Sequence, residues 1–263
     1  MRGPWKRALV SVGIAGLLLG TAACGGGDSD GTDAEAGAVS DVGEAGDPVE
    51  GGEITVGLEA ETNSWLPSEG TFNQPGTNVA YAIYDPLMHR TAEGTVEPYL
   101  AESMEPNAEL TEWTLKLRPD VQFHDGTPLN AQALKTVFDD YLKQPTSRVA
   151  ASLADVTSLD VVDGLTVVYR LAEPNAAFPD ELVTAAGWPF SPTAAAAAGD
   201  DAGANPVGTG PFRFVSWQRD SNLVVEKNAD YWQEGLPHLD KITFRPIPDE
   251  DTRLSSLQSS DID

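Results

Sequence analysis

Hydrophobic and polar residues alternate in several short segments of this chain, as they do in β-strands that bury one face. In residues 53–58, Ile54, Val56 and Leu58 share one face. The same pattern predicts further strands at residues 113–118, 121–123, 212–217, 222–227 and 241–247. Two more strands, 159–162 and 165–171, flank Asp163-Gly164, a dipeptide typical of two-residue hairpin turns.

Apolar steps of three and four residues predict helices between these strands. The clearest begins after Asn130 as N-cap, and its stripe consists of Leu134, Val137, Phe138, Tyr141 and Leu142. A second helix is predicted to start at Asn78, with Val79, Ile83 and Leu87 on one face and Pro86 limiting its length, and a third to start near Asp249. Strands and helices are mixed without regular alternation, so the predicted fold class is α/β with mixed sheets.

The first 23 residues have the pattern of an export signal. Three basic and no acidic residues stand at the start, and an apolar run over residues 8–20 follows, too short to span a bilayer comfortably. The run ends in Thr21-Ala22-Ala23-Cys24, which resembles the bacterial lipobox. We therefore predict a cleaved lipoprotein signal peptide at 1–23 and lipid attachment at Cys24; the alternative is a plain signal peptide with a chance cysteine. Cys24 is the only cysteine, so no intrachain disulfide can form.

Composition changes sharply after the cysteine. Residues 24–50 are mostly Gly, Ala, Ser, Thr, Asp and Glu with no aromatic residue, which predicts an acidic flexible tether. Cleavage after residue 23 would leave 13 basic and 41 acidic residues, a formal charge of −28. Such a charge argues against nucleic acid or any other polyanion as a partner.

Three segments together resemble the family 5 extracellular solute-binding proteins. The first runs from Pro98-Tyr99-Leu100 through Trp113 to Pro128, with the sequence Phe123-His124-Asp125-Gly126-Thr127-Pro128 at its end. The second is Gly208-Thr209-Gly210-Pro211-Phe212, continuing to Asn228-Ala229-Asp230-Tyr231-Trp232, and the third runs from Ile247 to Asp263. Their order and spacing behind a lipobox make the resemblance specific, and it covers residues 51–263.

The resemblance implies a type II periplasmic-binding-protein-like fold. One discontinuous lobe would consist of residues 51–85 and 190–263, with a small α+β domain inserted at 86–189. Proteins of this family are typically about twice as long, so the second lobe, with the acidic residue that pairs with a peptide's amino terminus, is expected to be missing. A single lobe offers one wall of a binding cleft, so this chain alone is expected to bind no ligand tightly.

The resemblance also implies a function and a location. The expected function is capture of a small solute, most often a peptide in this family, for delivery to the permease of an ABC importer. The expected location is the outer face of the cell membrane, through the lipid anchor. Nickel chelates, sugars and opines remain alternative ligands, and signalling or adhesion remains an alternative role for the same fold. A secreted enzyme is a third class, for which a visible nucleophile–base pair is required.

The loop at residues 59–77 is the candidate ligand-binding segment. It follows the first predicted strand at its carboxyl end, where open α/β sheets bind ligands. It is polar but contains Trp65 and Phe72, a combination that small-molecule clefts use. By resemblance to the family's peptide binders, Glu69, Gly70 and Thr71 would contact the ligand backbone. The alternative is that both aromatic side chains merely close the edge of the lobe.

Other candidate chemistry is weak. His89, His124 and His238 have no metal-ligand spacing, and His124 is expected to be structural. No G-x-S-x-G motif accompanies a catalytic triad, and Gly208-Thr209-Gly210-Pro211 lacks the third glycine and the lysine of phosphate-binding loops. Trp113, Trp188, Trp217 and Trp232 are predicted to be core. We therefore expect no catalytic residue, no metal and no cofactor.

Overall fold

The structure, a computed structural model, describes residue 46, residues 48–144 and residues 147–263. The predicted signal peptide, Cys24 and nearly all of the predicted tether lie outside the described residues. All helices and strands described below lie between residues 48 and 263.

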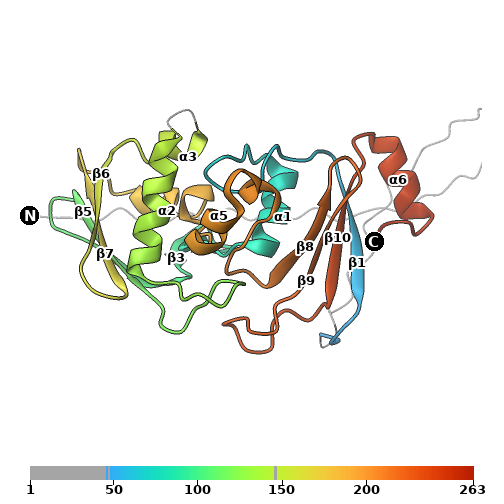
Figure 1. Cartoon of the computed structure of the whole chain (residues 1–263), viewed down its shortest axis with the longest axis horizontal. Coiled ribbons are helices and arrows are strands. Elements are labelled where there is room, and N and C mark those ends of the chain that lie inside the picture. The colour runs from blue at the N-terminus through green and yellow to red at the C-terminus, as the bar shows by residue number, and fades with distance from the viewer. Residues whose placement is uncertain (1–45, 47, 145–146) are drawn as a thin grey trace, which may run out of the picture. The chain divides into compact units, whose positions relative to one another are not determined.

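Two four-stranded sheets organise this part of the chain (Figure 1). The first sheet has the order β1-β10-β9-β8, with bounds Glu53–Leu58, Lys241–Pro246, Asn222–Lys227 and Phe212–Gln218. The second has the order β4-β5-β7-β6, with bounds Ala101–Pro106, Glu112–Leu117, Thr166–Leu171 and Val156–Val161. A small hairpin pairs β2 (Met88–Arg90) with β3 (Val96–Pro98).

The first sheet joins distant parts of the sequence. Strand β1 pairs in parallel with β10, so that Glu53 lies opposite Lys241 and Leu58 opposite Pro246. The other neighbours in this sheet are antiparallel. A parallel pair needs a long crossover, and here the whole of residues 59–240 forms it. The predicted domain boundaries after residues 85 and 189 stay a prediction.

Most of the described helices lie between the two sheets (Figure 1). The bounds of all the described helices are Gln74–Ile83 (α1), Ala131–Lys143 (α2), Arg148–Ser152 (α3), Phe178–Glu181 (α4), Pro192–Ala198 (α5) and Glu250–Gln258 (α6), with 3₁₀ turns at Ala185–Gly187 and Gly199–Ala204. Helix α1 packs on β8 and α2 packs on β6. Helix α6 lies on the other side of the first sheet, next to β1 (Figure 1).

Capping explains where the longer helices begin. The side chains of Asn130 and Asp249 accept hydrogen bonds from Ala133 N and Thr252 N, which confirms the predicted N-cap at Asn130 and the predicted helix start near Asp249. The prediction that α1 starts at Asn78 is wrong. Asn73 is its N-cap, with its side chain accepting from Gly76 N, and a proline follows in the first turn, where its missing N–H costs nothing.

The Gly208–Pro211 segment is a close backbone crossing, as expected. Gly210 N donates to the carbonyl oxygen of Ile83 at 2.9 Å. A Cβ on Gly208 would lie 2.1 Å from that same oxygen, so only glycine fits there. This crossing fixes the start of β8 against the carboxyl end of α1.

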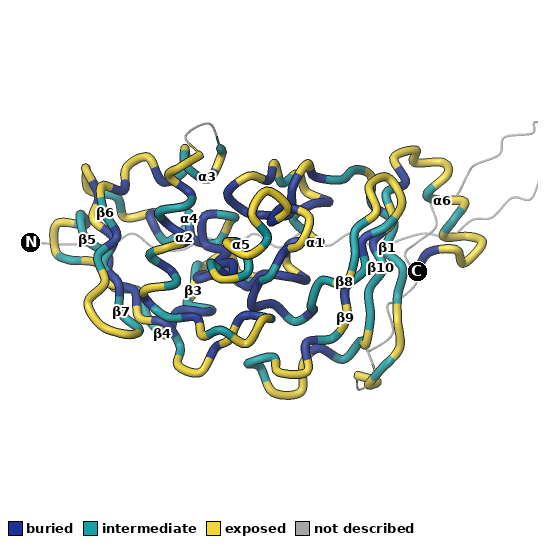
Figure 2. The backbone as a smooth tube through the Cα atoms, in the orientation of Figure 1, coloured by how far each residue is buried: buried dark blue, intermediate teal, exposed yellow. Residues whose placement is uncertain are grey.

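One continuous hydrophobic core runs through the described fold (Figure 2). Helix α1 contributes Val79, Ala80 and Ile83, all fully buried. The remaining large, fully buried side chains include Trp65, Tyr84, Leu87, Leu100, Leu115, Leu117, Tyr141, Leu153, Tyr169, Phe178 and Trp188. Burial of a side chain of this size contributes about 1.5–3 kcal/mol, so the core has no need of a disulfide.

Candidate ligand-binding site

The loop between β1 and α1 is held in shape by its own side chains. Asn63 Oδ1 accepts from Thr71 N at 2.8 Å, and Asn63 Nδ2 donates to Glu69 O at 3.2 Å. Ser64 Oγ donates to Glu69 Oε2 at 3.1 Å, and Gly70 N donates to Leu66 O at 2.8 Å. Side chains that satisfy neighbouring backbone groups in this way stabilise a compact loop without regular structure.

Gly70 allows the loop to pack tightly on itself. A Cβ at this position would lie 2.6 Å from Ser64 O and 2.5 Å from a ring carbon of Phe72. Any larger residue would therefore push the Phe72 ring and the adjacent backbone apart. Gly70 therefore sets the position of the Phe72 ring, and the two residues form the wall of the adjoining cavity.

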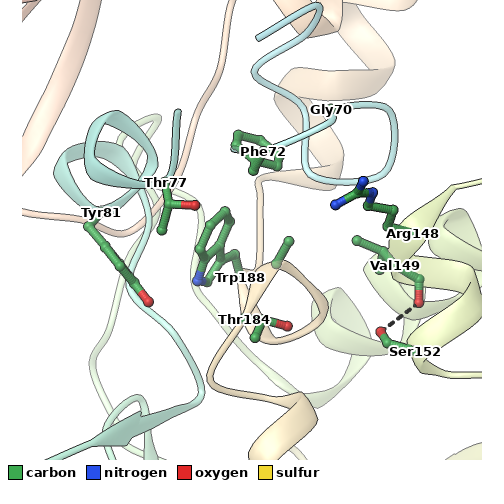
Figure 3. A pocket seen from close by; sticks show the side chains of 10 residues that line it. Gly70, Phe72, Thr77, Tyr81, Arg148, Val149, Ser152, Thr184 and Trp188 are labelled. Carbon is green, nitrogen blue, oxygen red and sulfur yellow. Dashed lines mark hydrogen bonds between the residues drawn. The ribbon is translucent and has the colours of Figure 1, made fainter. Parts of the chain in front are cut away.

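An aromatic cavity of about 310 Å³ opens beside this loop (Figure 3). Its lining residues come from the loop, α1, α3 and the turn before α5, and they are Gly70, Phe72, Thr77, Tyr81, Arg148, Val149, Ser152, Thr184, Ala185 and Trp188. Phe72 and Tyr81 both meet Trp188 edge to face, at ring-centroid distances of 5.1 and 5.4 Å. Such contacts favour a fixed arrangement of rings.

A polar cavity of about 490 Å³ adjoins the aromatic one. Its lining residues are Ser68, Glu69, Gly70, Thr71, Gln144, Ser147 and Arg148. Gly70 and Arg148 line both cavities, so they mark the boundary between an apolar and a polar compartment. A ligand with an apolar part and a polar end matches this division.

Arg148 is the charged group at the boundary. It is the first residue of α3, whose N-cap is Ser147, and its side chain is exposed. Figure 3 shows the guanidinium group extending toward Gly70 and Phe72. Among the described residues, no Asp or Glu lies within ion-pair distance of it. An arginine side chain without an internal ion pair can bind a carboxylate from outside the chain.

The predicted ligand-contact residues divide into two groups. Glu69, Gly70, Thr71 and Phe72 all line one or both cavities. Trp65 lines neither: it is only 1% exposed and packs under Phe72, at a centroid distance of 6.4 Å, and against Trp217, at 5.6 Å. The structure thus gives Trp65 a packing role beneath the wall, which corresponds to the alternative considered for it.

Three residues that line the aromatic cavity could not be identified from sequence patterns. Tyr81, Arg148 and Trp188 belong to no recognised motif, and Trp188 was expected only to be core. Trp188 is indeed 2% exposed, but one side of it faces the aromatic cavity. These residues meet the loop only because α1, α3 and the turn at 185–188 pack against it.

The histidines occupy separate places. His124 Nε2 lies 3.0 Å from Gly210 O, and burial lowers the pKa of His124 to about 4, so the ring is neutral and structural. His238 pairs with Glu50, and His89 packs against Tyr99. Within the described ranges, no three His, Cys, Asp or Glu side chains converge as metal ligands. No described helix combines the length and apolarity needed to cross a membrane.

Comparison with known proteins identifies the family. The family model "Bacterial extracellular solute-binding proteins, family 5 Middle" matches residues 95–263. This chain belongs to that family. The glutathione-binding protein GsiB of Pectobacterium atrosepticum is 37% identical over 187 residues, which are 70% of this chain and 36% of GsiB.

Two solved structures share the fold. The periplasmic binding protein AgaA of A. tumefaciens R10, in complex with agropinic acid, has a TM-score of 0.72 and 30% identity, covering 81% of this chain and 43% of AgaA. DppA of Helicobacter pylori, in complex with the peptide STSA, has a TM-score of 0.73 and 26% identity, covering 81% and 46%. The predicted periplasmic-binding-protein fold of mixed α/β type is thereby confirmed, and the chain spans less than half the length of each relative.

Proposed function

We propose that this chain is part of an extracytoplasmic substrate-binding protein that captures a small, carboxylate-bearing, peptide-like solute for an ABC importer. Family membership supports the general role. The glutathione-binding and peptide-bound relatives support a peptide-like ligand. The solute would bind reversibly and be released to a membrane permease, as expected for a binding protein whose parts close around a ligand.

One observation carries the choice of ligand: the junction of the aromatic and polar cavities at Gly70 and Arg148. An apolar side chain of the solute would pack against Phe72 and Trp188. Its carboxylate would pair with the guanidinium of Arg148, where two parallel N–H···O bonds are possible. Glu69, in the polar cavity, would favour a cationic group at the other end of the solute.

The direct test replaces Arg148. Arg148→Gln is expected to weaken glutathione binding at least about tenfold, since a hydrogen bond between charged groups contributes about 1.5–3 kcal/mol. Calorimetric titration of this chain at millimolar glutathione measures the change. Arg245→Gln is the matched control, because the Arg245 guanidinium bonds to Asp261 O, away from both cavities.

Two results would contradict the proposal. If the wild-type and Arg148→Gln chains bind glutathione with equal affinity, the carboxylate of the solute does not pair with Arg148. Conversion of glutathione or of a bound peptide into product, detected by mass spectrometry after prolonged incubation, would replace a binding role with catalysis. We expect the solute to be recovered intact.

The membrane attachment is part of the same proposal. Thr21-Ala22-Ala23-Cys24 supports cleavage before Cys24 and acylation of its thiol. Cys24→Ser is expected to move the protein from the membrane fraction to the soluble fraction outside the cell, because serine cannot carry the thioether-linked lipid. Immunoblots of the two fractions measure this, with Ser29→Ala as a control near the same site. Retention of Cys24→Ser in the membrane fraction would contradict the lipoprotein assignment.

A further inference from the structure

Two of the unpartnered buried polar atoms in the described fold belong to residues that line the candidate site, Ser68 and Trp188. Among the described residues, four buried side-chain atoms lack a hydrogen-bond partner: Trp65 Nε1, Ser68 Oγ, His124 Nδ1 and Trp188 Nε1. Buried polar groups are nearly always hydrogen-bonded in folded proteins, so each exception calls for an explanation. Of the two tryptophans, only Trp188 lines a cavity.

The indole ring of Trp188 is fixed from several sides. It stacks parallel to Tyr84 at 6.4 Å between centroids, and Phe72 meets it edge to face at 5.1 Å. Its backbone carbonyl accepts a hydrogen bond from the Tyr141 hydroxyl at 2.6 Å. A ring held in this way keeps its N–H in one direction, which is the preorganisation that a binding site requires.

Tyr81 is the neighbour on the side of the indole nitrogen. Figure 3 shows the nitrogen of Trp188 on the edge that faces Tyr81, and the two ring centroids are 5.4 Å apart. Tyr81 is 42% exposed and Trp188 is 2% exposed, so of the two rings Tyr81 is the one with solvent on one side into which it could turn. Rotation of Tyr81 would open the N–H to the aromatic cavity.

We propose that the indole N–H of Trp188 donates a hydrogen bond to an amide carbonyl oxygen of the bound solute, in the place that Tyr81 occupies here. The inference rests on the proposed function and narrows its ligand class. A neutral donor in a largely apolar compartment is best matched by a neutral acceptor, whereas a carboxylate is better matched by Arg148 at the boundary. The preferred solute therefore contains at least one amide bond.

The test observes the indole protons directly. In ¹⁵N–¹H spectra of this chain, titration with glutathione or with the peptide Ser-Thr-Ser-Ala is expected to move the Trp188 indole signal downfield. The Trp65 indole signal should stay in place, because Trp65 lies outside both cavities. Glutarate, which has carboxylates but no amide, should leave the Trp188 signal unmoved.

Matched variants separate hydrogen bonding from packing. Trp188→Phe assigns the signal and is expected to weaken glutathione binding about three- to tenfold, the value of one neutral hydrogen bond. Trp65→Phe removes the same unpartnered group from a ring that does not line a cavity, and should leave affinity unchanged.

Three outcomes would overturn the inference. If Trp188→Phe and Trp65→Phe weaken glutathione binding equally, the loss comes from altered packing and not from the missing indole N–H of Trp188. Binding that shifts the Gly70 amide signal while the Trp188 indole signal stays fixed would refute the inference and leave the proposed function standing. At millimolar peptide, where even weak binding to a single wall shifts signals, the absence of any shift with either peptide would refute both together.

Discussion

Asp85→Asn is expected to remove about 4 kcal/mol of pH dependence from the stability of this protein between about pH 4 and pH 8. Asp85 is buried, at 3% exposure. Its carboxylate accepts hydrogen bonds from Tyr231 Oη at 3.1 Å and Trp232 Nε1 at 2.8 Å, both neutral donors. Within the described residues, it forms no ion pair. Burial therefore raises the pKa of Asp85 to about 7, although the two hydrogen bonds oppose the rise.

The sign follows from the raised pKa. Between the ordinary pKa of an unfolded aspartate, about 3.9, and about 7 in the fold, the folded chain holds the proton and the unfolded chain does not. The contribution of Asp85 to stability is therefore greatest below the unfolded pKa. It is lost as the pH rises toward the folded pKa and stays constant above it. Three pKa units correspond to about 4 kcal/mol.

The measurement compares two stability profiles. Urea unfolding of the wild-type and Asp85→Asn chains at several pH values gives the difference in unfolding free energy between them. That difference should shift in favour of the asparagine variant as the pH rises, because asparagine is neutral throughout and still fits the Tyr231 and Trp232 groups. Asp240→Asn, which removes one exposed carboxylate, is the matched control. A constant difference across this pH range would contradict a buried, proton-binding Asp85.

Gly187→Ala is the second change with a large expected effect. A Cβ on Gly187 would lie 1.9 Å from Leu182 O and 2.5 Å from the Leu182 carbonyl carbon, and neither backbone atom can move aside cheaply. Gly187 O also accepts a hydrogen bond from Leu87 N at 2.8 Å, which ties this turn to β2. We expect a loss of about 3 kcal/mol in unfolding free energy, the upper part of the range for forced overpacking.

Thermal unfolding tests this prediction. A loss of that size should lower the Tm by about 6–12 °C for a fold of this length. Gly164→Ala is the matched control, since no atom lies within 4 Å of a Cβ there, and it should change stability by less than about 0.5 kcal/mol. Because Gly187 precedes Trp188, the variant should also weaken glutathione binding. If Gly187→Ala and Gly164→Ala have equal melting temperatures, the turn at Gly187 accommodates a Cβ without strain, and the prediction is wrong.

Local patterns in the sequence were enough for many of the elements. Alternation of apolar residues predicted β1 at 53–58 and β9 at 222–227 with the bounds that the structure has. A side-chain cap predicted the start of α2, and the residue pattern predicted the start of α6 near Asp249. These features depend on residues a few positions apart, so the chain carries their determinants within each segment.

Local patterns failed where a competing signal lay nearby or where strands were short. The residue pattern predicted the start of α1 at Asn78, but the N-cap is Asn73 and the first-turn proline is Pro75. Both residues lie in the segment 59–77, whose polar composition indicated a loop. Leu142, expected on the buried stripe of α2, is 42% exposed, whereas the other predicted members of the stripe are buried. The strands β2, β3 and β4 were not predicted. β2 and β3 have three residues each and pair with each other, and β4 pairs with β5, so pairing stabilises these strands more than their own composition does.

Residue patterns alone indicated the family, the mixed α/β class and a loop, Glu69 to Phe72, that lines the candidate site. The packing of distant elements placed Arg148 and Trp188 beside that loop. The physical reason is distance along the chain. Contacts between residues more than 70 positions apart arise when whole faces of helices and sheets pack, and no short stretch of sequence specifies which side chain of a packed face meets a cavity.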